Sequence, residues 1–445
     1  MGALFLLEGG EKMTIVWLGD DSEKVYGNNE TLQKLKLRPG QHITLHFGTI
    51  TIPKIIELSL ELANNEIAMS PKLTDQFSLP VDALYNVKAE GENVYLGPLV
   101  SLIVSKEKTS ITTEKLELMK ERLRNYQDIK GIFFVASQDL LNLGEGSCKG
   151  YYYTCTGEWK KWHFPLPEVI INRSYFKKDV YNELTSQIGS RVVSNCKMTK
   201  DKLWRLLKST SVRKFLPYTC RLRSYESLLD VMKNFPSVYL KPTNLSRGNG
   251  IIKMTKKENG IEIRSRKNET FIVSSKEELQ SYLHSLIKKR KYLIQQDVSY
   301  KEPKGRIADF RVYVQKDATK EWNCSGIICR LSKPGSIVSN YKYTESILSF
   351  HEASDKIFRF SELQEKELEN IIIEITKRVC RQLEEKGQIL SDVAIDVAID
   401  PSLKVWVLEV QVNYAVDERL YSLPEEMYKK VWTTPLEYAK ALCQF

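Results

Sequence analysis

A lysine and two glycines in the stretch VYLKPTNLSRGNGIIKM, residues 238–254, have the types and spacing of a phosphate-binding loop. Lys241 ends an apolar strand, where its ammonium group can contact phosphate oxygens as a point charge. Gly248 and Gly250 lack a Cβ atom, so backbone N–H groups can approach an anion closely there. A second strand and the turn Asn259-Gly260 follow, which excludes a Walker P-loop and a dinucleotide-binding fingerprint, because both need a helix after the loop. An ordinary hairpin explains this segment equally well.

The stretch SDVAIDVAIDPSLKVWVLEVQV, residues 391–412, brings two carboxylates together. Two strands joined by a turn are predicted, and pairing Asp400 with Val405 places Asp396 directly opposite Glu409. Like charges that face each other across a hairpin repel unless a cation lies between them. Mg²⁺ held by carboxylates and nucleotide phosphates meets that need; the alternative, an exposed strand with two unrelated acids, is disfavoured by apolar neighbours. Alternation puts four residues of the second strand on one face: Val405, Val407, Glu409 and Gln411.

Two arginines add planar cations to these groups. Asp309 and Arg311 lie two residues apart in RIADFRVYVQKD, so they share one face of a predicted strand. Arg330 and Asn340 follow in GIICRLSKPGSIVSN. Guanidinium groups bind phosphate and carboxylate oxygens in bidentate fashion. An isolated Asp-x-Arg is usually a surface ion pair. Here it lies in the sequence between the strand that ends at Lys241 and the hairpin of residues 391–412, which we call the acidic hairpin, and this position favours a role in binding an anion.

The elements that must position these groups alternate between helices and strands from about residue 190 onward. Residues 200–209, KDKLWRLLKS, are predicted to be helical, and residues 291–298, KYLIQQDV, are predicted to form a strand. Residues 366–387 have the pattern of an amphipathic helix that stops at Gly387. Its apolar face consists of Leu368, Ile372, Ile375, Val379 and Leu383.

Three domains are predicted. Residues 1–105 form a β-rich N-terminal domain, because short alternating strands such as QHITLHFGTITIP are separated by Gly, Asn and Pro. Residues 106–190 form an α/β domain with the buried-type strand KGIFFVAS, and residues 191–445 form the third domain. The aromatic stretch at residues 151–162 fits a hairpin with packed rings better than a platform on which bases stack.

The composition is typical of a globular protein of two to three domains, with 445 residues, 42% of them hydrophobic and 27% charged. The net charge of +10 weakly favours an anionic ligand. A nucleic-acid binder is the weakest alternative, since the basic run at residues 288–291 fits a solvated helix end. Eight scattered cysteines form no CxxC pair, which disfavours a zinc site and fits a reducing cytoplasm. We expect a cytoplasmic protein, because the N-terminus lacks a signal sequence and no stretch is long enough to span a membrane.

Taken in order, these motifs resemble the ATP-grasp superfamily, and within it the YheC/YheD-type endospore coat-associated proteins of spore-forming bacteria. The blocks that carry the resemblance are LGPLVSLIV, FPLPEVIINR, DKLW, FLPYT, YLKPTNLSRGNGI, DFRVYVQKD and VWVLEVQ. They cover nearly the whole chain, and their combination is specific. The resemblance implies an α+β and α/β multidomain fold: a β-rich N-terminal domain, an α/β pre-ATP-grasp domain and a C-terminal ATP-grasp fold whose two α+β subdomains hold ATP between them.

The resemblance also implies a role for each matching position. The residues implied to bind the phosphates of ATP are Lys202, Lys241, Gly248 and Gly250. Those implied to bind the adenine are Gln295, Gln296 and Val298, and Glu302 is implied to bind the ribose. The residues implied to hold Mg²⁺ are Asp396, Glu409 and Gln411. The residues implied to serve catalysis are Arg330, which stabilises the transferring phosphoryl group, Arg311 and Asn340.

Many ATP-grasp enzymes phosphorylate a carboxylate and let an amine attack the acyl phosphate, while metal ions and fixed cations neutralise the developing charge. The resemblance therefore implies a carboxylate–amine ligase that uses ATP and Mg²⁺ on unknown substrates in the sporulating cell. The alternative is a non-catalytic ATP-grasp protein that joins coat proteins as a structural component of the spore coat. Two departures favour it: Gln411 replaces the Asn of the usual Glu-x-Asn motif, and YKYTESILSF after Asn340 lacks the usual glycine-rich turn.

Overall fold

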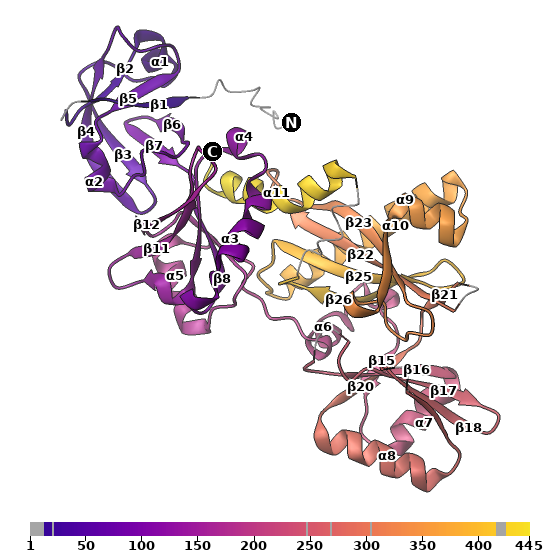
Figure 1. Ribbon diagram of the computed structural model, residues 1–445. Helices are drawn as coiled ribbons and strands as arrows, with labels where there is room; N and C mark the ends of the chain where they lie inside the picture. The colour runs from indigo at the N-terminus through magenta and orange to yellow at the C-terminus, as the bar shows by residue number, and fades with distance from the viewer. Residues whose placement is uncertain (1–12, 20–21, 246–247, 268, 303–304, 415–423) are drawn as a thin grey trace. The chain divides into compact units, whose positions relative to one another are not determined.

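The computed structural model describes residues 13–19, 22–245, 248–267, 269–302, 305–414 and 424–445, drawn as a coloured ribbon in Figure 1. The chain forms two compact units: unit 1 consists of residues 1–195, 317–321 and 432–445, and unit 2 consists of residues 196–316 and 322–431. The last helix, α11 (Glu425–Leu442), contributes residues to both. The N-terminal residues 1–12, on which the prediction about a signal sequence rests, and residues 246–247 of the glycine loop lie outside the described residues.

The first sheet of unit 1 contains the β-rich start of the chain. Its strand order is β1-β5-β2-β4-β3-β7-β6. The strands are β1 (Thr14–Trp17), β2 (Val25–Gly27), β3 (Gln41–Phe47), β4 (Ile50–Leu58), β5 (Glu66–Met69), β6 (Asn86–Glu90) and β7 (Asn93–Gly97), and the helices are α1 (Asn29–Lys34) and α2 (Lys72–Phe77). In β3 the alternate residues Ile43, Leu45 and Phe47 are buried, as the alternation in the sequence predicts.

The second sheet of unit 1 has the order β10-β11-β9-β8-β13-β14, with β12 paired to β11. Its strands are β8 (Leu99–Ser105), β9 (Ile132–Ser137), β10 (Leu141–Asn142), β11 (Ser147–Tyr153), β12 (Trp159–Pro165), β13 (Val169–Asn172) and β14 (Val192–Val193), and the helices are α3 (Thr113–Lys120), α4 (Tyr126–Ile129) and α5 (Lys178–Ile188). β8 runs parallel to β9 and β13. The predicted boundary at residue 105 assigns β8 to the N-terminal domain, whereas its pairing places it in this second sheet.

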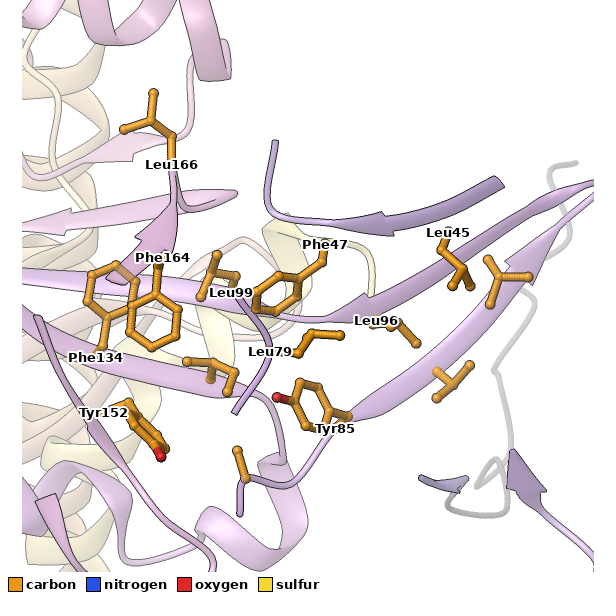
Figure 2. Close-up of a cluster of buried hydrophobic side chains, with 14 of the residues drawn as sticks. Leu45, Phe47, Leu79, Tyr85, Leu96, Leu99, Phe134, Tyr152, Phe164 and Leu166 are labelled. Atoms are coloured by element: carbon orange, nitrogen blue, oxygen red, sulfur yellow. The ribbon is translucent and has the colours of Figure 1, made fainter. Parts of the chain in front are cut away.

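One hydrophobic core joins the two sheets of unit 1 (Figure 2). Phe47 from β3 and Leu96 from β7 belong to the same buried cluster as Leu99 from β8, Phe134 from β9 and Phe164 from β12. The rings of Phe134 and Phe164 stack with their centroids 4.6 Å apart. The β-rich part and the α/β part therefore share buried apolar surface, so we expect them to fold together.

The aromatic stretch at residues 151–162 forms the predicted hairpin. β11 and β12 are antiparallel partners, with Tyr153 opposite Trp159. These two rings lie 5.2 Å apart, and the ring of Tyr152 lies 5.9 Å from that of Phe164. Because the rings pack against one another, a platform for stacking bases is not needed to explain them.

The smaller sheet of unit 2 has the order β15-β20-β16-β17-β18-β19. Its strands are β15 (Thr219–Arg221), β16 (Ser237–Pro242), β17 (Ile252–Lys257), β18 (Gly260–Ser265), β19 (Thr270–Val273) and β20 (Tyr292–Gln296), and its helices are α7 (Tyr225–Asn234) and α8 (Lys276–Lys289). In β16, Val238 and Leu240 pack in one core with the apolar residues of α7 and α8. Because side chains alternate along a strand, Tyr239 and Lys241 point to the opposite face, which we call the site face of this sheet.

The larger sheet of unit 2 has the order β24-β23-β22-β25-β26, with β21 paired to β22. Its strands are β21 (Tyr300–Lys301), β22 (Ile307–Lys316), β23 (Trp322–Ser332), β24 (Thr344–Ser349), β25 (Asp392–Ile399) and β26 (Val405–Gln411), and the helices are α6 (Lys200–Leu207), α9 (Phe350–Ala353) and α10 (Glu362–Glu385). All five predicted apolar residues of α10 are buried, and the helix starts earlier than predicted, after a capping box at Ser361. No helix in the described ranges combines the length and the apolar character needed to cross a bilayer.

A β-bulge in the acidic hairpin corrects one prediction. Asp396 does face Glu409, but Ile399, not Asp400, pairs with Val405, and the register shifts by one residue next to Asp396. An extra residue in one strand reverses the inward and outward alternation beyond it. Val405 and Val407 therefore lie in the core with α10, whereas Glu409 and Gln411 lie on the face of Asp396. The prediction that these four residues share a face is wrong.

Candidate functional site

A network of two carboxylates and two guanidinium groups covers the larger sheet on the face away from α10. Arg311 donates through Nε and Nη2 to the two oxygens of Asp396, at 2.9 and 3.2 Å. Arg330 forms a bidentate pair with Asp309, at 2.8 and 2.9 Å, and its Nη2 lies 3.2 Å from Asp396 Oδ2. The register produces these pairs, because Arg311 faces Asp396 between β22 and β25 and Asp309 faces Arg330 between β22 and β23. The structure thus brings together three residues predicted for catalysis and metal binding.

Asp396 is buried, and its charge is stabilised by its neighbours. Burial alone would raise the pKa of Asp396, but the guanidinium groups of Arg311 and Arg330 hold that pKa at about 2. Gln411 adds a hydrogen bond from Nε2 to Asp396 Oδ2 at 3.0 Å. With both arginines also within 3.2 Å of this oxygen, Asp396 is an anion that is already well solvated by protein groups.

Two lysines lie beside this network. Lys200, at the start of α6, has its Nζ 3.3 Å from Glu409 Oε1 and donates to the carbonyl oxygen of Leu245 at 3.1 Å. Lys241, at the end of β16, donates to Gln295 Oε1 at 2.6 Å. Burial, together with the positive charge of Lys200, lowers the pKa of Lys241 to about 8. An anion placed between the two ammonium groups would relieve their repulsion, which is the electrostatic requirement of a phosphate site.

Gly248 lies against Asn340, in the loop that follows β23. Gly248 and Gly250 both have φ of +70°, a backbone conformation that favours glycine. A Cβ atom on Gly248 would lie 2.5 Å from Nδ2 of Asn340. Nearby, Arg264 on β18 donates through Nη2 to the carbonyl oxygen of Gly335 at 2.5 Å. The antiparallel strands β16 and β17 that flank the loop were predicted, and the contact with Asn340 places a predicted catalytic residue beneath it.

The predicted adenine residues lie at the end of β20 and divide into two groups. Gln296 and Val298 line a pocket of about 540 Å³ together with residues 400–402. Two hydrogen bonds to Tyr218 fix Gln296. The backbone N–H of Gln296 donates to the carbonyl oxygen of Tyr218 at 2.9 Å, and the backbone N–H of Tyr218 donates to Gln296 Oε1 at 3.2 Å. Gln295, in contrast, uses its side-chain oxygen to bind Lys241. The structure therefore places Gln296 and Val298 at a cavity and Gln295 beside Lys241.

Two other predicted residues have their charged groups engaged elsewhere. Glu302 forms an ion pair with Arg306, whose Nη2 lies 2.8 Å from Glu302 Oε2. Lys202 donates through Nζ to the carbonyl oxygen of Lys197 at 3.3 Å. The lysine of α6 that reaches the acidic hairpin is Lys200, two residues earlier. The roles of Glu302 at a ribose and of Lys202 at a phosphate stay predictions.

Sequence reasoning missed a buried ion pair on the site face of the smaller sheet. Lys253 on β17 pairs with Asp297, and its Nζ lies 5.0 Å from the ring centroid of Tyr239. The hydroxyl of Tyr239 lies 3.1 Å from Ser299 Oγ. The signal was present in the sequence, because Lys253 lies between Ile252 and Met254, and alternation along β17 puts it on the face opposite these core residues.

The oxygen atoms best placed for a cation belong to Glu409 and Gln411. The side chain of Glu409 is 33% exposed, and its ion pair with Lys200 is long, at 3.3 Å. Gln411 uses Nε2 to bind Asp396, so its carbonyl oxygen can act as an acceptor. Mg²⁺ is commonly held by one or two carboxylates together with phosphate oxygens of a substrate. These residues fit such a shared cation; among the described side chains, no group of three His, Cys, Asp or Glu residues could hold a metal.

Comparison with known proteins gives a family. Residues 189–442, more than half of the chain, match the family described as YheC/D like ATP-grasp. The chain belongs to this family. The resemblance inferred from the motifs is thereby confirmed, and the smaller and larger sheets of unit 2 are the two α+β subdomains of an ATP-grasp fold.

Two relatives from Bacillus subtilis (strain 168) are similar over most of the chain. The endospore coat-associated protein YheD is 23% identical over 367 residues, which cover 77% of this chain and 78% of YheD. The endospore coat-associated protein YheC is 20% identical over 306 residues, which cover 65% of this chain and 82% of YheC. Both similarities extend beyond the matched family region into unit 1, since each is longer than that region.

Two solved structures are also similar. The D-Ala:D-Ser ligase VanG from Enterococcus faecalis has a TM-score of 0.43 and 11% identity, and the match covers 76% of this chain and 98% of VanG. The C-terminal domain of K. lactis Pby1, an ATP-grasp enzyme, has a TM-score of 0.40 and 12% identity, with 75% and 91% of the two chains covered. Scores this low carry no conclusion about function.

Proposed function

We propose that this chain binds ATP and Mg²⁺ and transfers the γ-phosphoryl group to a carboxylate, which an amine then attacks. The observation that supports this most strongly is the convergence of Lys200, Lys241 and Glu409 beside the arginine–aspartate network. Enzymatic phosphoryl transfer depends on positioning and on cations around the transferred group. The site offers that arrangement, and no serine or cysteine nucleophile is required.

The reaction has two balanced steps. An oxygen of the substrate carboxylate attacks the γ-phosphorus, the bond from that phosphorus to the β,γ-bridging oxygen breaks, and ADP leaves with the electron pair. The amine nitrogen then attacks the acyl carbon, phosphate leaves with the electron pair of its C–O bond, and the nitrogen loses a proton. Lys200 and Lys241 bind phosphate oxygens, and Arg330 stabilises the charge on the transferring group.

Glu409 and the carbonyl oxygen of Gln411 would hold Mg²⁺ against the phosphates. When bound, the ion neutralises phosphate charge that two lysines alone leave uncompensated. Asp396 has a different task in this proposal: it fixes the guanidinium groups of Arg311 and Arg330 in place. The adenine would occupy the pocket beside Gln296 and Val298.

The names of the two relatives support a place for this chain at the spore coat. We propose that it acts during sporulation on a coat component or its precursor. A fluorescent fusion in a spore-forming host tests this location: signal at the forespore surface is expected, and uniform signal through the mother cell would contradict it.

A non-catalytic coat component is the second candidate. Besides the two departures in the sequence, one structural observation favours it. Two guanidinium groups and Gln411 already bind the oxygens of Asp396, which leaves this acid poorly placed to hold a metal. ADP formation separates the two candidates. Purified chain is incubated with ATP, Mg²⁺, pooled carboxylic acids and hydroxylamine, an amine that converts an acyl phosphate to a stable hydroxamate.

The ligase proposal predicts hydroxamate and ADP in equal amounts, both lost in Arg330→Met. Lys233→Met is the matched control, since Lys233 is 74% exposed and pairs only with Asp230 among the residues described. Activity in this control equal to that of the wild type is expected. If no carboxylate pool supports ADP formation, the coat-component proposal takes precedence.

A further inference from the structure

The positive charge of this chain is concentrated in one short segment. Residues 197–223 contain nine lysines and arginines and one acid, Asp201, a net charge of +8, whereas the whole chain carries +10. The rest of the protein is therefore close to neutral. A local excess of this size attracts anionic partners to the surface that displays it.

The segment forms one wall of an open pocket of about 680 Å³. The pocket lies between α6, β15 and α7, and its basic lining residues are Arg205, Lys208, Arg221 and Arg223. The single acid in the lining, Asp230, is already paired with Lys233 at 2.8 Å. The pocket is thus concave, basic and of the size that binding sites commonly have.

The pocket is distinct from the proposed ATP site. The side chain of Thr219 on β15 lies on the site face of the smaller sheet. Its Oγ1 accepts a hydrogen bond from Gln295 Nε2 at 3.1 Å. Cys220 points the other way, against the core formed with α7 and α8, and it lines the pocket. The pocket thus lies along the edge strand β15, and its lining includes none of Lys200, Lys241, Gln295 and Glu409.

Two arginines of this pocket, Arg205 and Arg221, already bind a carboxylate. Asp201 on α6 accepts from Arg205 Nε at 3.0 Å and from Arg221 through two nitrogens at 3.2 Å. Lys208 and Arg223 are exposed at the pocket rim, and no carboxylate within the described part of the chain pairs with either. Lys208 and Arg223 are therefore available to further carboxylates, because Asp201 binds only Arg205 and Arg221.

We propose that this pocket binds an acidic segment of a polypeptide, rich in Asp and Glu. Guanidinium forks pair with carboxylates in bidentate fashion, and a run of acidic side chains can engage Lys208 and Arg223 together. The surface recruits such a partner whether or not the chain turns over ATP.

Single-stranded nucleic acid is the rival occupant, since the pocket also contains aromatic side chains. Base stacking needs free ring faces. Here Tyr218 packs against Phe235 with centroids 5.4 Å apart, and the ammonium group of Lys208 lies over Trp204, 4.9 Å from its centroid. One face of each of these rings already has a neighbour, which favours carboxylates over stacked bases.

The test measures binding of a fluorescein-labelled peptide of ten glutamates to the full chain by fluorescence anisotropy. A labelled oligonucleotide of ten thymidines is titrated in parallel. The pocket variant is Lys208→Glu with Arg223→Glu, and the matched control is Lys288→Glu with Lys289→Glu, two exposed residues at the end of α8. Lys208→Ala with Arg223→Ala is a milder second variant, and ATP binding and the thermal unfolding midpoint are measured for every form.

We expect the wild type to bind the glutamate peptide with an affinity that falls as salt rises. The pocket variant should weaken this binding about tenfold, the alanine variant less, and the control variant hardly at all, with ATP binding unchanged throughout. Absence of peptide binding, or equal weakening in the control variant, would overturn the proposal. Tighter binding of the oligonucleotide, lost in the pocket variant, would assign the pocket to nucleic acid instead. Failure of the wild type to bind ATP would remove the proposed ligase function without affecting this result.

Discussion

At the scale of single residues, the candidate site holds charged groups close together before any ligand binds. Lys241 and Lys200 repel each other, and burial makes the charge on Lys241 costly, so its pKa is about 8. Asp396, in contrast, lies between Arg311 and Arg330, which lower its pKa. One group is thus poised to gain a proton when an anion arrives, and the other keeps its charge at all physiological pH values.

Proton uptake by Lys241 on ATP binding is the first prediction. The triphosphate favours the ammonium form, so it raises the pKa of Lys241 above 8, and ATP should bind less tightly as pH rises from about 7 to 9.5. Calorimetry at pH 8.5 in two buffers of different ionisation enthalpy should show fractional proton uptake. Lys241→Met should abolish this uptake, and the same uptake in that variant would assign it to another group.

The second prediction concerns Asp396. Asp396→Asn removes the carboxylate that pairs with Arg311 and leaves the buried guanidinium group of Arg330 with Asp309 alone. Removing one member of a buried ion pair costs about 3–5 kcal/mol, and urea unfolding should show a loss of this size. Asp230→Asn, on an exposed pair, is the control and should cost less than about 1 kcal/mol. If Asp396→Asn lowers the free energy of unfolding as little as the control does, the ion-pair network does not stabilise the packing of β22, β23 and β25.

At the scale of elements, the glycine loop and the acidic hairpin show what sequence reasoning could and could not reach. The strands around Lys241 and the amphipathic helix α10 were predictable from periodicity, whereas the pairing of Asp396 with Glu409 was predicted from a register that the structure does not have. The bulge in β26 was not predictable, because an extra residue leaves no mark in an alternating apolar sequence. Its consequence is that Glu409 and Gln411 lie on the same face of the sheet as Asp396.

The third prediction tests the loop. Gly248→Ala combines a φ of +70° with a Cβ atom 2.5 Å from Asn340 Nδ2, so it should stop the loop from closing and weaken ATP binding about tenfold. The matched control is Gly387→Ala, where φ is +73° but nothing lies within 4 Å of the added atom. It should cost about 1–2 kcal/mol of stability and leave ATP binding unchanged. Equal ATP affinity in the two variants would show that loop closure does not matter for binding.

At the scale of the whole molecule, residues 432–445 pack with unit 1, although the sequence predicts that they end the ATP-grasp domain. The guanidinium group of Arg122 lies 5.2 Å from the ring centroid of Trp432, and Lys440 donates to the carbonyl oxygen of Ile129 at 2.7 Å. Contacts between residues about 310 positions apart leave no local signal in a sequence, which is why periodicity could not reveal them.

The fourth prediction follows from that packing. Trp432 is 3% exposed, so Trp432→Ala should destabilise unit 1 by about 3–5 kcal/mol. Trp162→Ala is a suitable control, because Trp162 is 37% exposed and should contribute much less. Thermal unfolding followed by tryptophan fluorescence measures both. If Trp432→Ala leaves the first transition of unit 1 unchanged, the C-terminal residues do not stabilise that unit.

We propose above all that Lys241 and Glu409 form one nucleotide site, with a metal ion between Glu409 and the phosphates. Titration calorimetry with ATP, with and without Mg²⁺, tests it most directly on the wild type, Lys241→Met and Glu409→Gln. We expect Mg²⁺-dependent binding in the wild type, weaker binding in Lys241→Met under both conditions, and loss of the Mg²⁺ dependence alone in Glu409→Gln. Equal binding by all three proteins, or none by the wild type, would contradict it.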